Sequence, residues 1–146
     1  MIENTINQDL RGALLSGNKD LVRVLRFIKS IIQDYKVNNN LDRQLSLDDN
    51  KILMILTKEI KKMSESLDIY LKINDQSKIT ESKKEIEIVS KYLPEPVSED
   101  EIRIVINRIR RSKPELNFGQ IISAVREEMG PTIDGGMVAR LVKEIL

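Results

Sequence analysis

Apolar residues recur every three or four positions along almost the whole sequence, and this spacing limits the fold more than any other feature. A typical stretch carries Leu21, Leu25, Ile28 and Ile32. Residues at these intervals lie on one face of an α-helix, whereas a half-buried strand needs apolar residues at every second position. No segment keeps such an alternation. The sequence therefore predicts an all-α protein.

Capping and helix-breaking residues divide this pattern into seven predicted helices. Gly17 and the run Asn38–Asn40 should end the first two helices, and the polar stretch Asn74–Ser77 should form the turn before the fourth. We expect Leu14 to lie on the inward face of the first helix and Phe118 to pack at a helix end. The predicted helices cover about residues 2–16, 18–37, 46–70, 79–93, 99–112, 117–129 and 134–145.

Two prolines, Pro94 and Pro96, interrupt the helical pattern beyond the middle of the chain. Proline lacks the N–H that a helix interior needs, and it pushes the preceding residue toward extended backbone. Ser98 and Glu101 follow at the spacing of a capping box, which predicts a new helix start. The predicted parts are an N-terminal four-helix domain (residues 1–93), a linker (94–97) and a C-terminal three-helix tail bundle (98–146).

The composition narrows the chemistry that this chain can perform. It contains no cysteine and no histidine, which removes thiol nucleophiles and the commonest ligands for zinc. With no Trp, two Phe and three Tyr, a site that stacks nucleic-acid bases on aromatic rings is also disfavoured. We therefore expect no catalytic residues, no cofactor and no metal. An enzyme would have to rely on carboxylates, lysine, tyrosine or a hydroxyl.

No apolar run approaches the roughly 18–20 residues that a membrane-spanning helix requires. The first residues, Met1–Thr5, also lack the basic flank and apolar stretch of a secretory signal. We therefore expect no membrane partner and a cytoplasmic location.

The densest cluster of cations lies in the fifth predicted helix and just after it. Arg103, Arg108, Arg110, Arg111 and Lys113 are five cations within eleven residues. Arginine donates two parallel hydrogen bonds to one phosphate, so the cluster is a candidate nucleic-acid contact. The alternative is an ordinary solvated helix face, whose cations balance acidic residues at the start of the same helix and complement its dipole. The residues alone leave both interpretations open.

Two smaller motifs favour structural roles. The sequence 134–136 reads Asp-Gly-Gly, but no strand or phosphate-loop pattern accompanies it, so we expect Asp134 to cap the last helix. Glu81 and Glu85 lie one helical turn apart beside Lys83 and Lys84. We expect ordinary surface salt bridges there and no acid–base pair.

The order of several motifs resembles one protein family, the GatB/YqeY family. Residues 85–102 read EIEIVSKYLPEPVSEDEI, which is similar to its signature E-x-E-x-x-x-x-Y-L-P-x-x-x-S-x-x-E. Further matching positions are Asp9–Leu10, Arg23–Arg26, Gly119, Met129 and several within 134–144. The resemblance therefore covers essentially the whole chain, and it is closest to the standalone YqeY-like members.

This resemblance implies the same four-helix part and three-helix tail. In the B subunit of the tRNA-dependent amidotransferase, similar modules follow the catalytic domain, and the tail helps to hold tRNA. The complex converts Glu-tRNA or Asp-tRNA into the amidated form with glutamine as amido-nitrogen donor. A carbon–nitrogen ligase label would therefore describe such relatives, because this chain has no counterpart of their catalytic domain.

Three hypotheses follow for the function. The first is a tRNA-binding accessory module that acts in translation through the cation cluster. The second is a protein–protein adaptor without RNA binding, which the near-neutral net charge of +1 favours. The third is a stand-alone enzyme, which the absence of histidine, cysteine and a nucleotide-binding loop disfavours. The oligomeric state is left open by the sequence.

Overall fold

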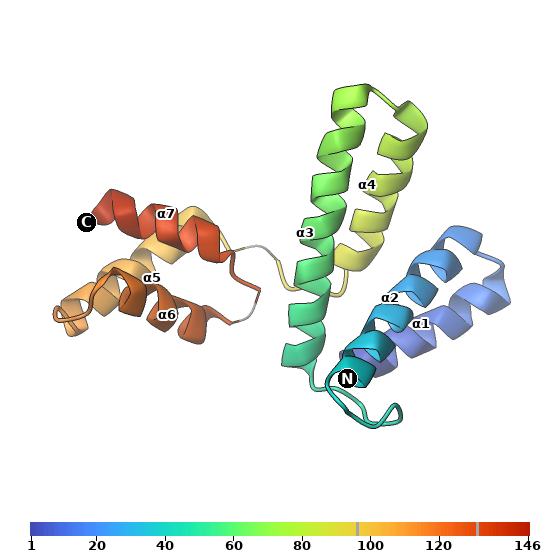
Figure 1. Ribbon diagram of the computed structural model, residues 1–146, viewed down its shortest axis with the longest axis horizontal. Helices are drawn as coiled ribbons and strands as arrows, with labels where there is room; N and C mark the ends of the chain where they lie inside the picture. The colour runs from blue at the N-terminus through green and yellow to red at the C-terminus, as the bar shows by residue number, and fades with distance from the viewer. Residues whose placement is uncertain (96, 131) are drawn as a thin grey trace. The chain divides into compact units, whose positions relative to one another are not determined.

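The computed structural model describes residues 1–95, 97–130 and 132–146, and across these residues it contains seven helices and no strand (Figure 1). The predicted all-α class is therefore confirmed. Pro96, which is part of the predicted linker, lies outside the described residues. The helices are α1 (Ile2–Ser16), α2 (Lys19–Asn38), α3 (Asp49–Ile73), α4 (Gln76–Ser90), α5 (Glu99–Ser112), α6 (Phe118–Met129) and α7 (Gly135–Ile145).

The chain separates into two compact units, Met1–Leu93 and Pro94–Leu146, which are described here one at a time. In the first unit, α1 packs along α2 and α3 packs along α4, so that consecutive helices form two hairpins (Figure 1). Contacts of α2 with both α3 and α4, and of α1 with α3, join the hairpins.

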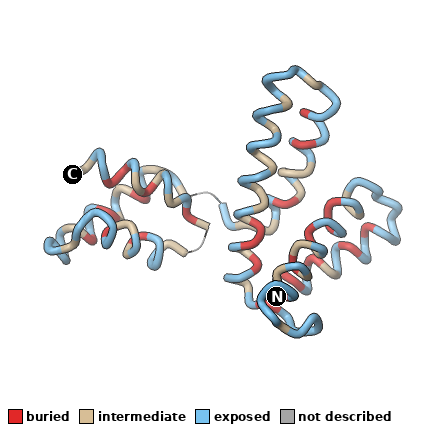
Figure 2. The backbone as a smooth tube through the Cα atoms, in the orientation of Figure 1, coloured by how far each residue is buried: buried red, intermediate tan, exposed pale blue. Residues whose placement is uncertain are grey.

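The first unit is built around apolar side chains from all four of its helices. Its buried centre includes Ile6, Leu25, Ile28, Ile52 and Val89. Each of these residues lies on the inward stripe that the helical spacing defines, and buried positions recur along the helices in the same way (Figure 2). Burying an Ile, Leu or Val side chain contributes about 1.5–3 kcal/mol, so this core is the main source of stability.

Local backbone signals set the helix ends of the first unit. Gly17 adopts a left-handed conformation, with φ of 73°, and closes α1 as predicted. Asn74, also left-handed with φ of 56°, ends α3, and the Asp75 side chain accepts the Lys78 N–H at 3.2 Å to start α4. The predicted turn over Asn74–Ser77 was therefore too long, because these two residues are enough to reverse the chain.

The inward prediction for Leu14 was wrong. Leu14 is 50% exposed, because the face of α1 that is buried contains only Glu3, Ile6, Leu10 and Ala13. It has helical spacing but lies beyond the edge of the packed face. Phe118, which was expected to pack at a helix end, is the first residue of α6 and is 37% exposed, because the buried stripe begins only at Ile121.

A buried ion pair lies inside the first unit, and the sequence reasoning missed it. Lys36 on α2 is only 2% exposed, and its Nζ donates to Glu3 Oε1 on α1 at 2.5 Å. The other carboxylate oxygen, Glu3 Oε2, accepts the Leu47 N–H at 2.7 Å. Because Leu47 belongs to the loop between α2 and α3, the pair holds that loop against both helices.

The second unit consists of α5, α6 and α7, and each of these helices contacts the other two. Their buried residues include Ile106, Ile121, Val125, Val138 and Leu141. Burial again follows one stripe per helix (Figure 2). This smaller core holds the helix that carries the cation cluster.

Side-chain caps start the helices of the second unit. Ser98 Oγ accepts the Glu101 N–H at 3.2 Å, which is the first half of the predicted capping box and the only half found among the described residues. A complete box is present instead at α6, where Asn117 and Gln120 cap each other's backbone N–H groups at 2.9 and 3.0 Å. Asp134 caps α7 through the Gly136 N–H at 2.9 Å, as predicted.

Candidate functional site

The helix α5 is electrically polarised from end to end. Its first turn carries Glu99, Asp100 and Glu101, and its last turn carries Arg110 and Arg111. Acidic groups at a helix N-terminus and basic groups at its C-terminus both interact favourably with the helix dipole. The buried side of α5 contributes to the core, so these charged groups are left on its outer faces.

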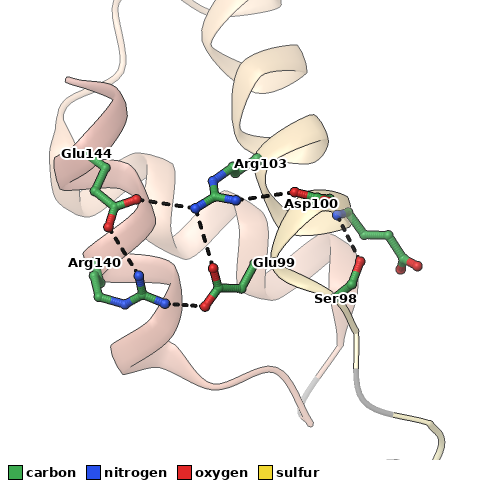
Figure 3. Close-up of polar contacts among 7 residues, drawn as sticks. Ser98, Glu99, Asp100, Arg103, Arg140 and Glu144 are labelled. Atoms are coloured by element: carbon green, nitrogen blue, oxygen red, sulfur yellow. Dashed lines mark hydrogen bonds and ion pairs between the residues drawn. The ribbon is translucent and has the colours of Figure 1, made fainter.

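At the acidic end, two arginines join α5 to α7 through shared carboxylates (Figure 3). Arg103 donates to Asp100 at 3.2 Å, to Glu99 at 3.4 Å and to Glu144 at 3.5 Å. Arg140 donates to Glu99 at 2.5 Å and to Glu144 at 3.1 Å. The hydrogen bond to Glu99, followed by the attraction of both carboxylates, raises the pKa of Arg140. Arg103 therefore lies within a network of three carboxylates and two arginines, in which its charge is compensated.

The opposite end of α5 forms a cationic hollow of about 360 Å³. Arg110, Arg111 and Lys113 line it, together with Asn107 and apolar side chains from the neighbouring segments. Arg110 Nη1 donates to the carbonyl of Ile145 at 3.3 Å, which fixes this side chain across the end of α7. The hollow is thus lined by both cationic and apolar side chains.

A second hollow of about 570 Å³ shares Asn107 and Arg111 with the first and also includes Arg108. Arg108 forms an ion pair with Glu128 of α6. Asn107 and Arg111 can line both hollows because residues four apart lie above one another on a helix. Sequence reasoning missed Asn107, although its spacing from Arg111 was a usable signal.

The five predicted site residues therefore divide into two groups. Arg108, Arg110, Arg111 and Lys113 line the two hollows, whereas Arg103 belongs to the carboxylate network. The seven-residue spacing puts Arg103 on the same face as Arg110, but seven residues also span about 10 Å along a helix. That separation places the two arginines at opposite ends of α5.

A family model described as Yqey-like protein matches residues 3–146. The chain belongs to the Yqey-like family. The resemblance drawn from the sequence signature is therefore confirmed. A comparison with curated proteins gives no match.

In this Yqey-like chain, the signature residues of the first unit contact one another across helices. Tyr92, from the Tyr-Leu-Pro motif, donates to Asp9 of α1 at 2.5 Å. Burial and this hydrogen bond raise the pKa of Tyr92. Arg23 of α2 donates to Glu85 of α4 at 2.6 Å, and this bond raises the pKa of Arg23. These motif residues connect α4 and the segment after it to the first hairpin.

The acidic residues of α4 in this Yqey-like chain form salt bridges, but with partners that were not predicted. Glu81 and Glu85 both pair with Arg23 on α2, at 3.4 and 2.6 Å. Lys84 pairs instead with Asp20, at 2.7 Å, and lowers the pKa of that carboxyl. The expectation of ordinary surface salt bridges is therefore confirmed, and the partners of Glu81 and Glu85 come from α2.

Two further findings concern metal sites and membrane-spanning helices. Within residues 1–95, 97–130 and 132–146, no cluster of three or more acidic side chains has the arrangement of a metal site. None of the described helices combines the length and apolar character that a membrane span needs.

Proposed function

We propose that the C-terminal unit of this Yqey-like protein is a non-catalytic RNA-binding module that contacts the phosphate backbone of tRNA. The observation that carries the proposal is the cationic hollow, in which Arg110, Arg111 and Lys113 converge at one end of α5. The adjoining hollow adds Arg108 and shares Arg111 with the first. Two neighbouring concave sites that share Arg111 suit a polyanion whose charges repeat along a chain.

Recognition in this proposal depends on charge and shape. Arginine is suited to phosphate because its planar fork donates two hydrogen bonds to one group. The three tyrosines all lie between residues 35 and 92, so the second unit has no tyrosine or tryptophan on which a base could stack. Binding should therefore be similar for different tRNA sequences.

The charge of the second unit limits the expected strength of binding. Residues 94–146 contain eight lysines and arginines against nine aspartates and glutamates, so attraction has to come from the local cluster. With four cations in the contact, the logarithm of the binding constant should fall with the logarithm of salt concentration with a slope of about −3. Binding should thus be clear at low salt and weak at physiological salt.

The test compares the parent chain with the triple variant R108A/R110A/R111A in a tRNA retardation assay at low salt. We expect the triple variant to bind every tRNA tested more weakly and to have a shallower salt dependence. The matched control is K58A/K61A/K62A, which removes the same charge from exposed positions of α3. Circular dichroism is used to check that both variants stay helical. Equal tRNA binding by the parent and R108A/R110A/R111A, or equal losses in both triple variants, would show that this surface is not the contact.

The proposal also covers the arrangement of the helices and the cellular role of the protein. We infer a four-helix N-terminal bundle joined to a three-helix tail, by analogy with the region that follows the catalytic domain in the amidotransferase B subunit. In this view the protein is an accessory factor related to tRNA amidation and acts in the cytoplasm during translation. Turnover of glutamine or of misacylated tRNA by the purified chain would contradict the non-catalytic assignment.

A second candidate, a protein–protein adaptor, is favoured by a hollow on the first unit. A space of about 490 Å³ at the α1–α2 hairpin is lined by Leu14 and Val22, with Lys19 and Arg26 beside them. Such a surface fits a partner helix with one apolar and one acidic face. Capture from extract before and after nuclease treatment separates the candidates, because an adaptor keeps its partner when RNA is removed.

A further inference from the structure

The buried Lys36 ammonium has donor capacity beyond its ion pair. Its Nζ donates to Glu3 at 2.5 Å and to the carbonyl of Arg43 at 3.4 Å. A lysine ammonium carries three N–H donors, so one is left after these two contacts among the described residues. Lys36 also lines a hollow of about 150 Å³, into which a further donor can be directed.

The Glu3 carboxylate also lines this hollow, but both of its oxygens already accept a hydrogen bond within the protein. Glu3 Oε1 accepts from Lys36, and Glu3 Oε2 accepts the Leu47 N–H at 2.7 Å. Its negative charge is balanced by the single charge of Lys36. The remaining character of the hollow is therefore set by the side chains around it.

Five of the surrounding side chains are cationic or carry amides, and the other three belong to Ile6, Ile32 and Ser46. Lys29 and Arg43 add two positive charges, and Asn7, Gln33 and Gln44 add side-chain amides. Among the described contacts, none of these three amide side chains has a hydrogen-bond partner within the protein. A wall of this kind offers many N–H donors and a net excess of two positive charges.

We propose that this hollow is a binding site for a small anion with oxygen acceptors, either a phosphate or a carboxylate. The ligand accepts the remaining Lys36 N–H, while Lys29 and Arg43 neutralise its charge from the rim. The hollow of about 150 Å³ has room for a single anionic group. The site belongs to the first unit and is separate from the cationic surface of α5.

The bound anion also contacts the loop between α2 and α3. Arg43 and Gln44 come from this loop, and Leu47 follows them with its N–H on Glu3. Backbone N–H signals of residues 43–47 therefore report directly on occupancy. The same signals distinguish this site from the α5 hollows, which would be reported by Asn107 and Arg111.

The experiment is an NMR titration of the full chain with sodium phosphate in one series and sodium succinate in another, with sodium chloride holding the ionic strength constant. We expect saturable shifts of the residue 43–47 signals with at least one of the two anions. Saturation with phosphate alone identifies a phosphate site, and saturation with succinate alone identifies a carboxylate site. Either result supports a built anion site.

The decisive variant is K29Q/R43Q, which removes the rim charges and leaves the buried pair intact. We expect it to bind about a hundredfold more weakly, because each of the two lost charge-assisted contacts costs roughly tenfold. The control K61Q/K62Q removes two exposed charges from α3 and should bind like the parent. The proposal is overturned if neither anion gives saturable shifts in the parent, if K29Q/R43Q binds as well as the parent, or if the shifts are confined to Asn107 and Arg111.

Discussion

Replacing Lys36 by methionine tests how much the buried ion pair contributes to the first unit. Methionine fills nearly the same volume as lysine without its ammonium, so K36M leaves no large cavity. It does leave the Glu3 carboxylate buried, with the Leu47 N–H as its one remaining partner in the described structure. The substitution therefore isolates the loss of the charge from the loss of packing.

The expected cost follows from the burial of both partners. The side chains of Lys36 and Glu3 are 2% and 10% exposed. Removing one partner of such a pair typically costs about 3–5 kcal/mol, because the other charge is left without compensation. A unit of 93 residues has a free energy of unfolding of about 5–14 kcal/mol. K36M should therefore remove a large fraction of the stability of the first unit.

A second substitution at Glu3 should restore much of this loss. In E3Q/K36M the glutamine carbonyl can still accept the Leu47 N–H, and its amide can donate to the carbonyl of Arg43. No buried charge is left, and neutral replacements of buried pairs are often tolerated. We expect the double variant to be about 2 kcal/mol more stable than K36M, a coupling typical of residues in direct contact.

The assay is urea unfolding followed by tyrosine fluorescence. The chain has no tryptophan, and its three tyrosines, Tyr35, Tyr70 and Tyr92, all belong to the first unit, so the signal reports that unit alone. K62M, at an exposed position of α3, is the control and should unfold like the parent. If K36M loses less than about 1 kcal/mol, or if E3Q/K36M is no more stable than K36M, the reasoning about a buried pair is refuted.

Two further predictions concern the first unit. Because burial and Asp9 raise the pKa of Tyr92, its pKa in the folded state exceeds its unfolded value. The protonated Tyr92 therefore contributes fully to the free energy of unfolding below about pH 10, and this contribution falls as the pH rises above that value. An absorbance titration should therefore show the same tyrosinate signal near pH 10 for the parent and for Y92F, and a smaller signal in Y92F there would contradict this. Changing Gly17, whose φ is 73°, to Ala should lower the free energy of unfolding by about 1–2 kcal/mol. Gly12 lies within α1 and has no atom near an added Cβ, so changing it to Ala should raise the free energy of unfolding by about 0.5–1 kcal/mol. Urea unfolding by tyrosine fluorescence measures both glycine variants, and shifts of the same sign would contradict the conformational argument.

The helix pattern could be predicted because its signals are local. The fifth helix was expected at residues 99–112, and α5 has these bounds. Asn18 and Asp134 were expected to start helices, and both side chains accept a backbone N–H from the first turn. Spacing and caps act over three or four residues, so one stretch of sequence contains all the information that they need.

The buried ion pair was missed although the sequence contains a signal for it. Glu3 lies three residues before Ile6, and Lys36 lies four residues after Ile32, so each continues the inward stripe of its helix. Each charge looks like a stray surface residue when its helix is considered alone. Only the packing of α1 against α2 brings the two together.

Most residues of the candidate site could be predicted from the sequence, but their separation into two groups could not. The cation cluster was evident from α5 alone, and four of its members line the two hollows. The contacts of Arg103 with Glu99 and Asp100 follow from helix spacing, but its contact with Glu144 joins residues that are 41 apart in the chain. No local pattern predicts that contact, because it arises from the way in which α7 packs against α5.

The two signature contacts of the first unit bear on how members of this family can diverge. Tyr92 and Asp9 are 83 residues apart in sequence, and Arg23 and Glu85 are 62 apart, yet each pair forms a single hydrogen bond. A substitution at one member is therefore tolerated best when its distant partner changes with it. Both hydrogen bonds are exposed, so a chimera that takes α4 and the Tyr-Leu-Pro segment from one relative should be slightly more stable when its first hairpin comes from the same parent.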